Sequence, residues 1–150
     1  MYQLNRNSRG FTLIETIVVL SISISLMVIG HASIIQWKES YETDAFFDVF
    51  KSDILYLQQR TMVSGDYYYM LIKPDEHIYE IRKGGYGALV RIRSIPENWE
   101  VRLQTLSMPL SFTIKGQVRQ PGSFTILTGD ESYKVIFPFG KGRSYVVSQS

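Results

Sequence analysis

The chain has 150 residues, no cysteine and a formal net charge of +2 at pH 7. Its length suffices for one domain with a modest core, and the lack of cysteine excludes disulfide bonds and thiolate metal sites. Arg6 and Arg9 are the only basic residues before Gly10, and without them the Lys and Arg residues equal the 14 acidic residues in number. Overall charge therefore gives no argument for nucleic-acid binding.

A long apolar segment near the amino terminus has a carboxylate close to its start. Twenty residues, Thr16 to Ile35, contain no Asp, Glu, Lys or Arg, and Glu15 directly precedes them. Such a segment is long enough to cross a hydrocarbon layer of roughly 30 Å as a helix. An ordinary secretory signal has a shorter apolar core, of about 7 to 15 residues, followed by its cleavage site. The sequence therefore predicts that residues 11–35 form a membrane helix that stays in the mature protein.

The six residues from Gly10 to Glu15 read Gly-Phe-Thr-Leu-Ile-Glu. They resemble the prepilin signal of type IV pilins and type II secretion pseudopilins. The resemblance implies that residues 1–10 are a leader peptide, which a prepilin peptidase removes between Gly10 and Phe11 before it methylates the new amino terminus. An isolated carboxylate in hydrocarbon is costly unless it is paired or protonated. By the same resemblance, Glu15 pairs with the terminal amine of a neighbouring subunit; the alternative is a glutamate that reaches the headgroups of a plain membrane anchor.

Charges on either side of the apolar segment predict its orientation. Arg6 and Arg9 precede the segment, and a stretch of mixed sign follows it, consisting of Lys38, Glu39, Glu42 and Asp44. The positive-inside rule then places the amino terminus in the cytoplasm. We expect a single-pass protein of the cell membrane with residues 36–150 as an outer globular domain, which assembly carries to the cell surface in a pseudopilus.

The stretch from Gln36 to Ser64 contains neither Pro nor Gly and is predicted to continue the helix. Its apolar residues recur at steps of three and four, as on one face of a helix; they are Phe46, Val49, Phe50, Ile54 and Leu57. A helix from Thr12 to Met62 would be about 75 Å long at about 1.5 Å per residue. That length suits a filament subunit better than a compact domain, and Gly65 provides a stop signal.

Short segments rich in aromatic and β-branched residues follow the helix and predict strands. They are Tyr67–Ile72, Ile78–Arg82, Leu89–Arg93, Trp99–Leu103, Leu110–Ile114, Ser123–Leu127, Tyr133–Phe137 and Ser144–Ser148. Turn signals rich in Pro, Gly and Asp separate them, among them Pro74–Glu76 and Gly84–Gly87. We expect an α+β domain, as in pilins, in which the amphipathic half of the helix covers one face of an antiparallel sheet.

Three segments resemble the ComGD-type minor pseudopilins of the competence machinery in Gram-positive bacteria. They are Gly10–Leu20, Asp53–Gln59 and Ile136–Arg143. The first segment is specific for the superfamily, whereas the other two select among subfamilies. Many pilins close a carboxy-terminal loop with a disulfide, and the lack of cysteine departs from that pattern. This departure disfavours a major pilin.

The search for a catalytic, cofactor or metal site yields no strong candidate. The chain has two histidines, and His77 lies in a predicted acidic turn, where a solvated turn is favoured over a cation site. Arg91, Arg93 and Arg102, with nearby aromatic residues, are a candidate DNA-contact patch. Arg91 and Arg93 share one strand face because they are two residues apart. Since acidic residues balance the basic ones, a solvated sheet face is favoured here too.

The resulting hypothesis is a non-enzymatic minor pseudopilin of a competence pilus, needed for DNA uptake and without cofactor or metal. Its expected partners are the other major and minor competence pseudopilins, the prepilin peptidase and the membrane, with DNA reached through the assembled filament. Two alternatives stay open. One is a pseudopilin of a type II secretion system, and the other is a single-pass anchored extracellular binding domain in which Glu15 has no assembly role.

Overall fold

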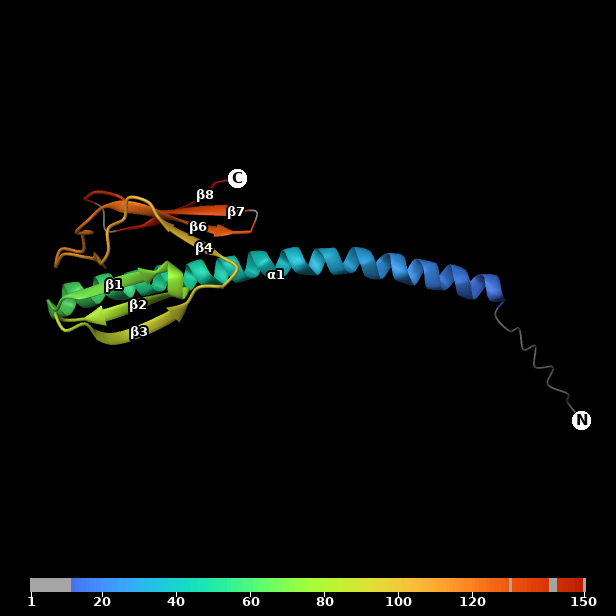
Figure 1. The fold of residues 1–150 in the computed structure, drawn as a ribbon, viewed down its shortest axis with the longest axis horizontal. Coiled ribbons are helices and arrows are strands. Elements are labelled where there is room, and N and C mark those ends of the chain that lie inside the picture. Colours follow the sequence, from blue (N-terminus) through green and yellow to red (C-terminus); the bar gives the residue numbers. More distant parts are fainter. Residues whose placement is uncertain (1–11, 130, 141–142, 150) are drawn as a thin grey trace, which may run out of the picture. The chain divides into compact units, whose positions relative to one another are not determined.

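A computed structural model describes residues 12–129, 131–140 and 143–149, with the backbone alone for residues 29–39. The predicted leader 1–10 and the predicted processing residues Gly10 and Phe11 lie outside the described residues. The chain divides into two compact units, Met1–Glu42 and Thr43–Ser150. The helix α1, Leu13–Ser64, has residues in both units, and every described strand belongs to the second (Figure 1).

The apolar segment predicted at residues 11–35 forms the first part of α1 from Leu13 onward. Residue 11 and the side chains of residues 29–35 lie outside the described part of this segment. Across the portion of the chain that the structure describes, no helix combines the length and the apolar character needed to cross a membrane.

In the second unit, α1 packs through an apolar stripe. Phe47, Phe50, Ile54 and Leu57 are at most 5% exposed and recur at three- and four-residue steps. The prediction of a core face is confirmed for Phe50, Ile54 and Leu57. Val49, in contrast, is 41% exposed. Val49 lies about 100° around the helix from Phe50, at the edge of the buried stripe. Phe47, which was not among the predicted stripe residues, is buried instead.

The described strands form two four-stranded antiparallel sheets (Figure 1). The strands are β1 (Tyr68–Lys73), β2 (Ile78–Lys83), β3 (Ala88–Ser94), β4 (Glu100–Leu103), β5 (Leu110–Ser111), β6 (Gly122–Thr128), β7 (Glu131–Phe137) and β8 (Tyr145–Gln149), and a short 3-10 helix, η1 (Pro74–Glu76), follows β1. Their order is β3-β2-β1-β5 in the first sheet and β4-β6-β7-β8 in the second. Each strand lies at one of the predicted segments.

The core lies where one face of each sheet meets α1. The ring centroid of Phe50 is 5.4 Å from that of Tyr79 in β2 and 5.7 Å from that of Phe124 in β6, so one helix side chain contacts both sheets. The predicted α+β fold, with the amphipathic half of the helix packed on antiparallel strands, is confirmed. The strands form two sheets where the sequence analysis expected one, and both sheets pack against the buried stripe of α1.

β3 is the outer strand of the first sheet, and none of its residues is buried. Its pairing with β2 shifts between Ile81 and Arg82, which leaves Val90 as an extra residue. Leu89, Val90 and Ile92 are between 39% and 54% exposed. Apolar burial therefore contributes little to holding β3 in place, and its ladder with β2 and its charged side chains matter more.

Candidate functional site

Glu15 lies in the first turn of α1. Its backbone N–H donates to the Thr12 carbonyl oxygen at 3.1 Å and lies 3.4 Å from Thr12 Oγ1. Thr12 is therefore the N-cap and Glu15 the N3 residue, which is the spacing of a capping box. A carboxylate in the first turn also interacts favourably with the helix dipole. The Glu15 carboxylate thus favours the start of the helix, and any test of the predicted assembly role must separate the two effects.

The described residues that follow Glu15 present apolar side chains outward. The large apolar side chains from Leu13 to Val28 are between 49% and 81% exposed. Ser21, Ser23 and Ser25 donate their hydroxyl hydrogens to the carbonyl oxygens four residues earlier, at 2.8 to 2.9 Å. These bonds satisfy the hydroxyl donors within the helix itself. The surface of this segment therefore suits an apolar environment, such as lipid or the apolar faces of other helices.

Arg91 and Arg93 of β3 both bind one carboxylate. Asp53 of α1 is fully buried and accepts hydrogen bonds from Arg91 Nη1, from Arg93 Nε at 3.0 Å and from Tyr79 Oη at 3.0 Å. The Arg91 guanidinium also lies over the Tyr56 ring, with Cζ 4.5 Å from the ring centroid. The side chains of Arg91 and Arg93 are 34% and 43% exposed, so both side chains keep contact with water.

The strand register explains why these groups meet. Tyr79 and Ile81 of β2 are buried against α1, and they pair directly with Arg93 and Arg91 of β3. Paired residues of neighbouring strands project to the same face of a sheet. Both arginines therefore extend from an exposed strand toward the helix, where Asp53 receives them.

The surroundings of Asp53 determine its ionisation. Burial by itself raises the pKa of this carboxyl, but the hydrogen bonds from both arginines and from Tyr79 outweigh burial and hold the pKa below its usual value. Burial, together with the adjacent Asp53 charge, raises the pKa of the Tyr79 phenol. The hydrogen bond to Asp53 also raises the pKa of Arg93. At neutral pH, a buried carboxylate is thus surrounded by three donors.

Arg102 lies apart from the other two arginines, on β4 of the second sheet. It donates to Glu100 from Nε at 2.6 Å and from Nη2 at 3.0 Å. The side chains of Arg102 and Glu100 are 61% and 59% exposed. The structure thus brings Arg91 and Arg93 together and places Arg102 in a different sheet. Contact of the three arginines with DNA stays a prediction.

Asp53 is the central residue that the sequence analysis did not single out. It lies three positions after Phe50 and four before Leu57, which places a carboxylate on the apolar stripe of the helix. Such a position is a signal of a buried ion pair, because acidic residues are almost never fully buried without a partner. Its arginine partners lie 38 and 40 positions away, so only the strand order identifies them.

Residues 5–30 match the family described as the prokaryotic N-terminal methylation motif. The matched residues include the predicted cleavage position between Gly10 and Phe11 and the predicted assembly residue Glu15. A comparison with curated proteins found no match. The chain therefore carries a recognised methylation motif at its amino terminus.

The fold is similar to that of a solved pseudopilin, the minor pseudopilin EpsH from the type 2 secretion system of Vibrio cholerae. The two chains share 15% sequence identity with a TM-score of 0.52, and the match covers 67% of this chain and 92% of that chain. The fold of this chain is pilin-like. The motif and the fold together support a type IV pilin-like protein.

Proposed function

We propose that the chain is a minor pseudopilin, a structural subunit that assembles with other pilin-like chains and catalyses no reaction. The observation that carries this proposal is a methylation motif at residues 5–30, which overlaps the first part of α1, together with a second part of α1 that packs on two antiparallel sheets. The exposed apolar side chains from Leu13 to Val28 add support, because they need lipid or neighbouring helices as partners. Membrane insertion of residues 11–35, with residues 36–150 outside, belongs to the same proposal.

Within this class we propose a role in a competence pilus that takes up DNA. The support is the resemblance of Gly10–Leu20, Asp53–Gln59 and Ile136–Arg143 to ComGD-type pseudopilins. The partners are then the other major and minor competence pseudopilins and the prepilin peptidase. A deletion strain is expected to lose transformation by added DNA while it keeps normal protein secretion.

A type II secretion pseudopilin is the second candidate, and the fold shared with EpsH favours it. In that case the same assembly serves protein export. The deletion strain separates the two candidates, because loss of secretion with normal transformation supports this second role. Loss of transformation alone supports the first.

Processing at Gly10 tests the pseudopilin proposal itself. We expect mass spectrometry of the membrane fraction to find a mature chain that begins at methylated Phe11. Gly10→Leu should leave the precursor uncut, whereas Ser8→Leu, a change within the leader, should mature normally. Normal maturation of Gly10→Leu would contradict the proposal, and an uncut parent chain would favour the anchored binding domain.

The assembly role of Glu15 needs a variant that removes the charge and a control that removes only the helix cap. Glu15→Val should keep processing and insertion, because it makes the segment more apolar, and should lose co-purification with partner pilins. Thr12→Ala removes the N-cap at a cost of about 1 kcal/mol but keeps the carboxylate, so it should still assemble. If the two variants lose assembly equally, the start of the helix is what assembly requires and the pairing role is wrong.

For DNA we propose contact through the assembled filament. Arg91 and Arg93 already bind Asp53, and Arg102 already binds Glu100. A phosphate would have to compete with these carboxylates. We therefore expect no salt-sensitive DNA binding by the full-length chain in a gel-shift titration. Sub-micromolar, salt-sensitive binding that neutralisation of all three arginines abolishes would instead make them a receptor.

A further inference from the structure

β3 has one edge that pairs with no described strand. In the first sheet β3 pairs with β2, and no described strand lies on its other side. The Ile95 N–H donates to the His77 carbonyl oxygen at 2.7 Å, which makes these two residues a hydrogen-bonded pair. Such pairs alternate with non-bonded pairs along an antiparallel ladder, and Ile92 and Ser94 occupy non-bonded positions. Their backbone N–H and C=O groups therefore point away from β2, toward the free edge.

These outward backbone groups have no hydrogen-bond partner among the described residues. Ile92 and Ser94 are both exposed. With seven residues, β3 is also the longest of the described strands that lie at the edge of a sheet. An exposed strand edge is a template for an extended segment of another protein, whose backbone continues the ladder.

The side of α1 next to this edge is rich in positive charge. Arg60 and Arg91 both lie against the Tyr56 ring, with Cζ 5.4 and 4.5 Å from its centroid. Arg91 and Arg93 share the Asp53 carboxylate, whereas Arg60 is exposed and has no ion pair within the described residues. We call Arg60, Arg91 and Arg93 the basic flank. Its three guanidinium groups have one carboxylate among them, which leaves two positive charges uncompensated.

The basic flank keeps donors for a further acceptor. Asp53 is bound by Arg91 through Nη1 and by Arg93 through Nε, and the other guanidinium nitrogens of these two residues make no hydrogen bond to asparagine, aspartate or glutamate side chains in the described part of the chain. A guanidinium group has five N–H donors. Each arginine can therefore bind a second carboxylate without leaving Asp53.

The opposite face of β3 is apolar. Leu89 and Ile92 pair with Arg82 and Glu80 of β2, which alternate with the buried residues of that strand and so face away from α1. The charges on this face are compensated, because Glu80 binds both Arg82 and Lys73. A strand added at the free edge would thus meet positive charge on one face and apolar side chains on the other.

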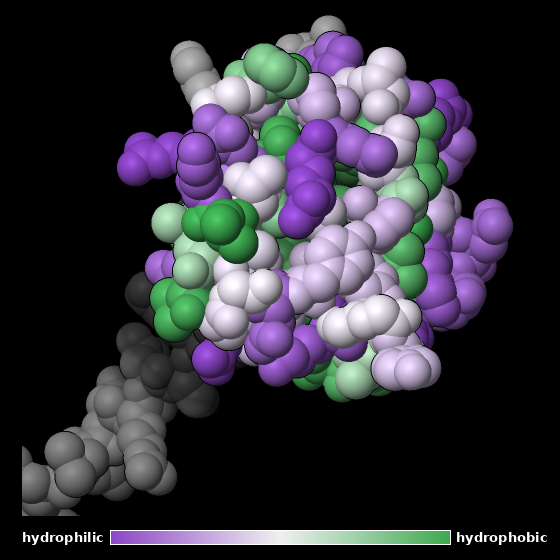
Figure 2. All heavy atoms as spheres, turned by 90° about the vertical axis from the view of Figure 1, so that its left-hand side faces the viewer, coloured by the Kyte–Doolittle hydropathy of each residue, from purple (hydrophilic) through white to green (hydrophobic). Residues whose placement is uncertain are grey.

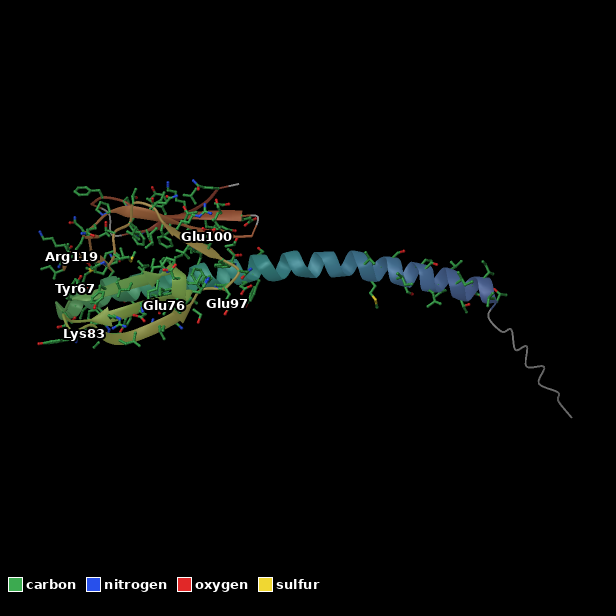
Figure 3. All side chains as sticks on the ribbon, viewed as in Figure 1. Tyr67, Glu76, Lys83, Glu97, Glu100 and Arg119 are labelled. Carbon is green, nitrogen blue, oxygen red and sulfur yellow. The ribbon has the colours of Figure 1, made fainter. Side chains whose placement is uncertain are left out.

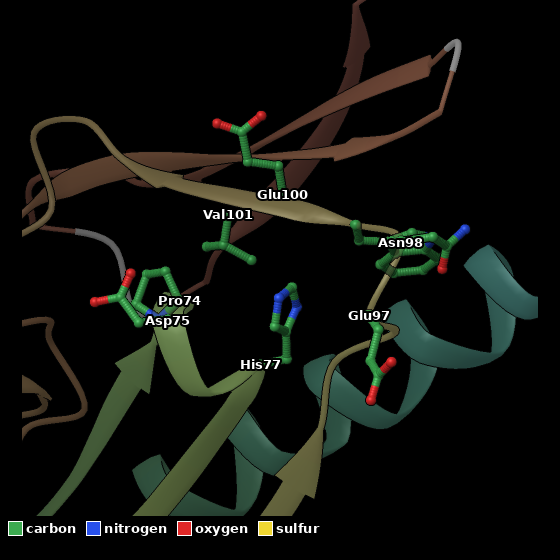
Figure 4. Close-up of a pocket in the computed structure, with 8 residues that line it drawn as sticks. Pro74, Asp75, His77, Glu97, Asn98, Glu100 and Val101 are labelled. Atoms are coloured by element: carbon green, nitrogen blue, oxygen red, sulfur yellow. The ribbon is translucent and has the colours of Figure 1, made fainter.

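The two ends of β3 differ in charge. Figure 3 labels Lys83, which pairs with the first residue of β3, and Glu97, which follows its last residue by three positions. Glu97 lines a cleft of about 570 Å³ together with Asp75 and His77 (Figure 4). Both carboxylates are exposed there and would repel an acidic partner. Figure 2 looks onto the other end, where β3 begins, and shows hydrophilic side chains over much of its surface. An acidic partner is thus favoured along the edge of β3 and disfavoured beyond its last residue.

We propose that the free edge of β3 binds an extended acidic segment of a different pilin-like subunit, which adds a strand to the first sheet. The acidic residues of this segment, at every second position, contact the basic flank, and the apolar residues between them contact Leu89 and Ile92. The inference rests on the proposed function, because the assembly supplies the partner subunit.

Charge explains why the occupant is not a second copy of this edge. Two β3 strands paired edge to edge would bring their arginines close together, and like charges in opposite positions destabilise a strand pair. The basic flank thus disfavours self-pairing and favours an acidic strand. A nucleic acid offers phosphates to the flank but cannot continue the ladder, so an acidic polypeptide uses more of this surface.

Fluorescence anisotropy with labelled peptides tests the chemistry of the partner. The full-length chain in detergent is titrated with three peptides: Glu-Val-Glu-Val-Glu, its uncharged counterpart Gln-Val-Gln-Val-Gln, and the acidic peptide with methylated valine nitrogens. The second peptide lacks the charge, and the third lacks the N–H donors that pair with the edge. We expect the unmodified acidic peptide to bind about tenfold more tightly than either of the others.

Variants of the chain test the two parts of the site separately. Arg60→Gln leaves the Asp53 cluster intact and should weaken binding of the acidic peptide about threefold. Lys51→Gln is its matched control, because Lys51 is also an exposed cation of α1 but lies on the opposite side of the helix, and it should change nothing. Ser94→Pro removes an outward N–H and no bond to β2, so it should weaken binding about tenfold at an unchanged denaturation midpoint.

Co-purification from membranes tests the identity of the partner. The double variant Arg60→Gln/Ser94→Pro should recover less of the partner pilins than the parent, whereas Lys51→Gln should recover as much. The mature amino terminus, read by mass in the same samples, keeps the two claims apart. A cut and methylated chain that binds no acidic peptide removes this inference alone, and an uncut chain removes the pseudopilin role.

Several outcomes would overturn the inference. They are equal binding of the charged and uncharged peptides, binding that neither valine methylation nor Ser94→Pro weakens, or recovery of partner pilins that the double variant does not lower. A single-stranded oligonucleotide that binds where the acidic peptide does not, and is lost with Arg60→Gln, would assign the flank to nucleic acid. A dimer of the parent chain that Ser94→Pro dissociates would assign the edge to a second copy. Either result also overturns the proposal.

Discussion

Two contacts between arginine and carboxylate in the outer domain use the same chemistry at different depths. The Asp53 side chain is 1% exposed and has three donors, whereas the Glu100 side chain is 59% exposed and, among the described residues, binds only Arg102. Burial removes the competition of water but makes the carboxylate dependent on its donors. An exposed carboxylate returns to water at little cost. The burial of the carboxylate therefore decides which of the two contacts stabilises the fold, although the distance between nitrogen and oxygen is short in both.

The largest expected effect is that of Asp53→Ala. The change removes the acceptor for two guanidinium groups and a buried phenol, and it should lower the free energy of unfolding by about 3 kcal/mol, the low end for a broken buried ion pair. The low end applies because both arginines still reach water. Chemical denaturation followed by tyrosine and tryptophan fluorescence measures this change. A loss as small as that of a surface substitution would show that the cluster contributes no stability.

Acid should lower the free energy of unfolding of the outer domain because it protonates Asp53. The folded pKa of Asp53 is depressed, so its contribution is fully present above the unfolded pKa of about 3.9 and is lost as the pH falls through the folded pKa. The loss should be smaller than that of Asp53→Ala, because a protonated carboxyl still fills the site. Denaturation midpoints measured from pH 6 down to a pH below the folded pKa, for the parent and for Asp53→Asn, check this. The two curves should converge in acid, and parallel curves would contradict the assignment.

Tyr79→Phe should have an intermediate effect. It removes the phenol that donates to Asp53 at 3.0 Å but leaves both arginines and the buried ring. A hydrogen bond to a charged group contributes about 1.5 kcal/mol, and a loss of that size is expected. A double-mutant cycle with Asp53→Asn measures the coupling, and additive losses would show that the phenol and the carboxylate act independently.

The smallest expected effect is that of Arg102→Gln. Its contact with Glu100 lies in water on the second sheet, so the denaturation midpoint should not change measurably. Arg93→Gln is the matched comparison, because it removes one guanidinium from the buried carboxylate. A larger loss for Arg102→Gln than for Arg93→Gln would reverse the order that depth predicts.

Local patterns predict most of the fold. The stretch from Gln36 to Ser64 has no Pro or Gly, and α1 indeed continues to Ser64. Aromatic and β-branched residues predict strands such as β1, whose side chains alternate between buried and half-buried positions. The segment Leu110–Ile114 is a shorter strand than predicted, because Thr113 starts a turn by accepting from Gly116. Which strands share a sheet is a nonlocal property, and no local pattern reports it.

The candidate site likewise has one part that local sequence predicts and another that depends on contacts between residues distant in sequence. Gly10 to Glu15 is a contiguous motif, and both its family match and the Thr12 cap are local. The ion cluster joins α1 to β3 across 38 and 40 positions. From the sequence, the spacing of Arg91 and Arg93 indicates a shared face. Whether that face meets solvent or Asp53 depends on which side of the sheet the helix covers.

The lack of any buried residue in β3 has a consequence for local unfolding. A strand held only by its ladder with β2 and by two arginine side chains opens at a lower free energy than the core strands. When β3 opens, Arg91 and Arg93 leave Asp53 together, and their charge becomes available to other anions. An anion that takes both arginines away from Asp53 therefore binds the opened form, and its affinity is reduced by the small fraction of time that the strand is open.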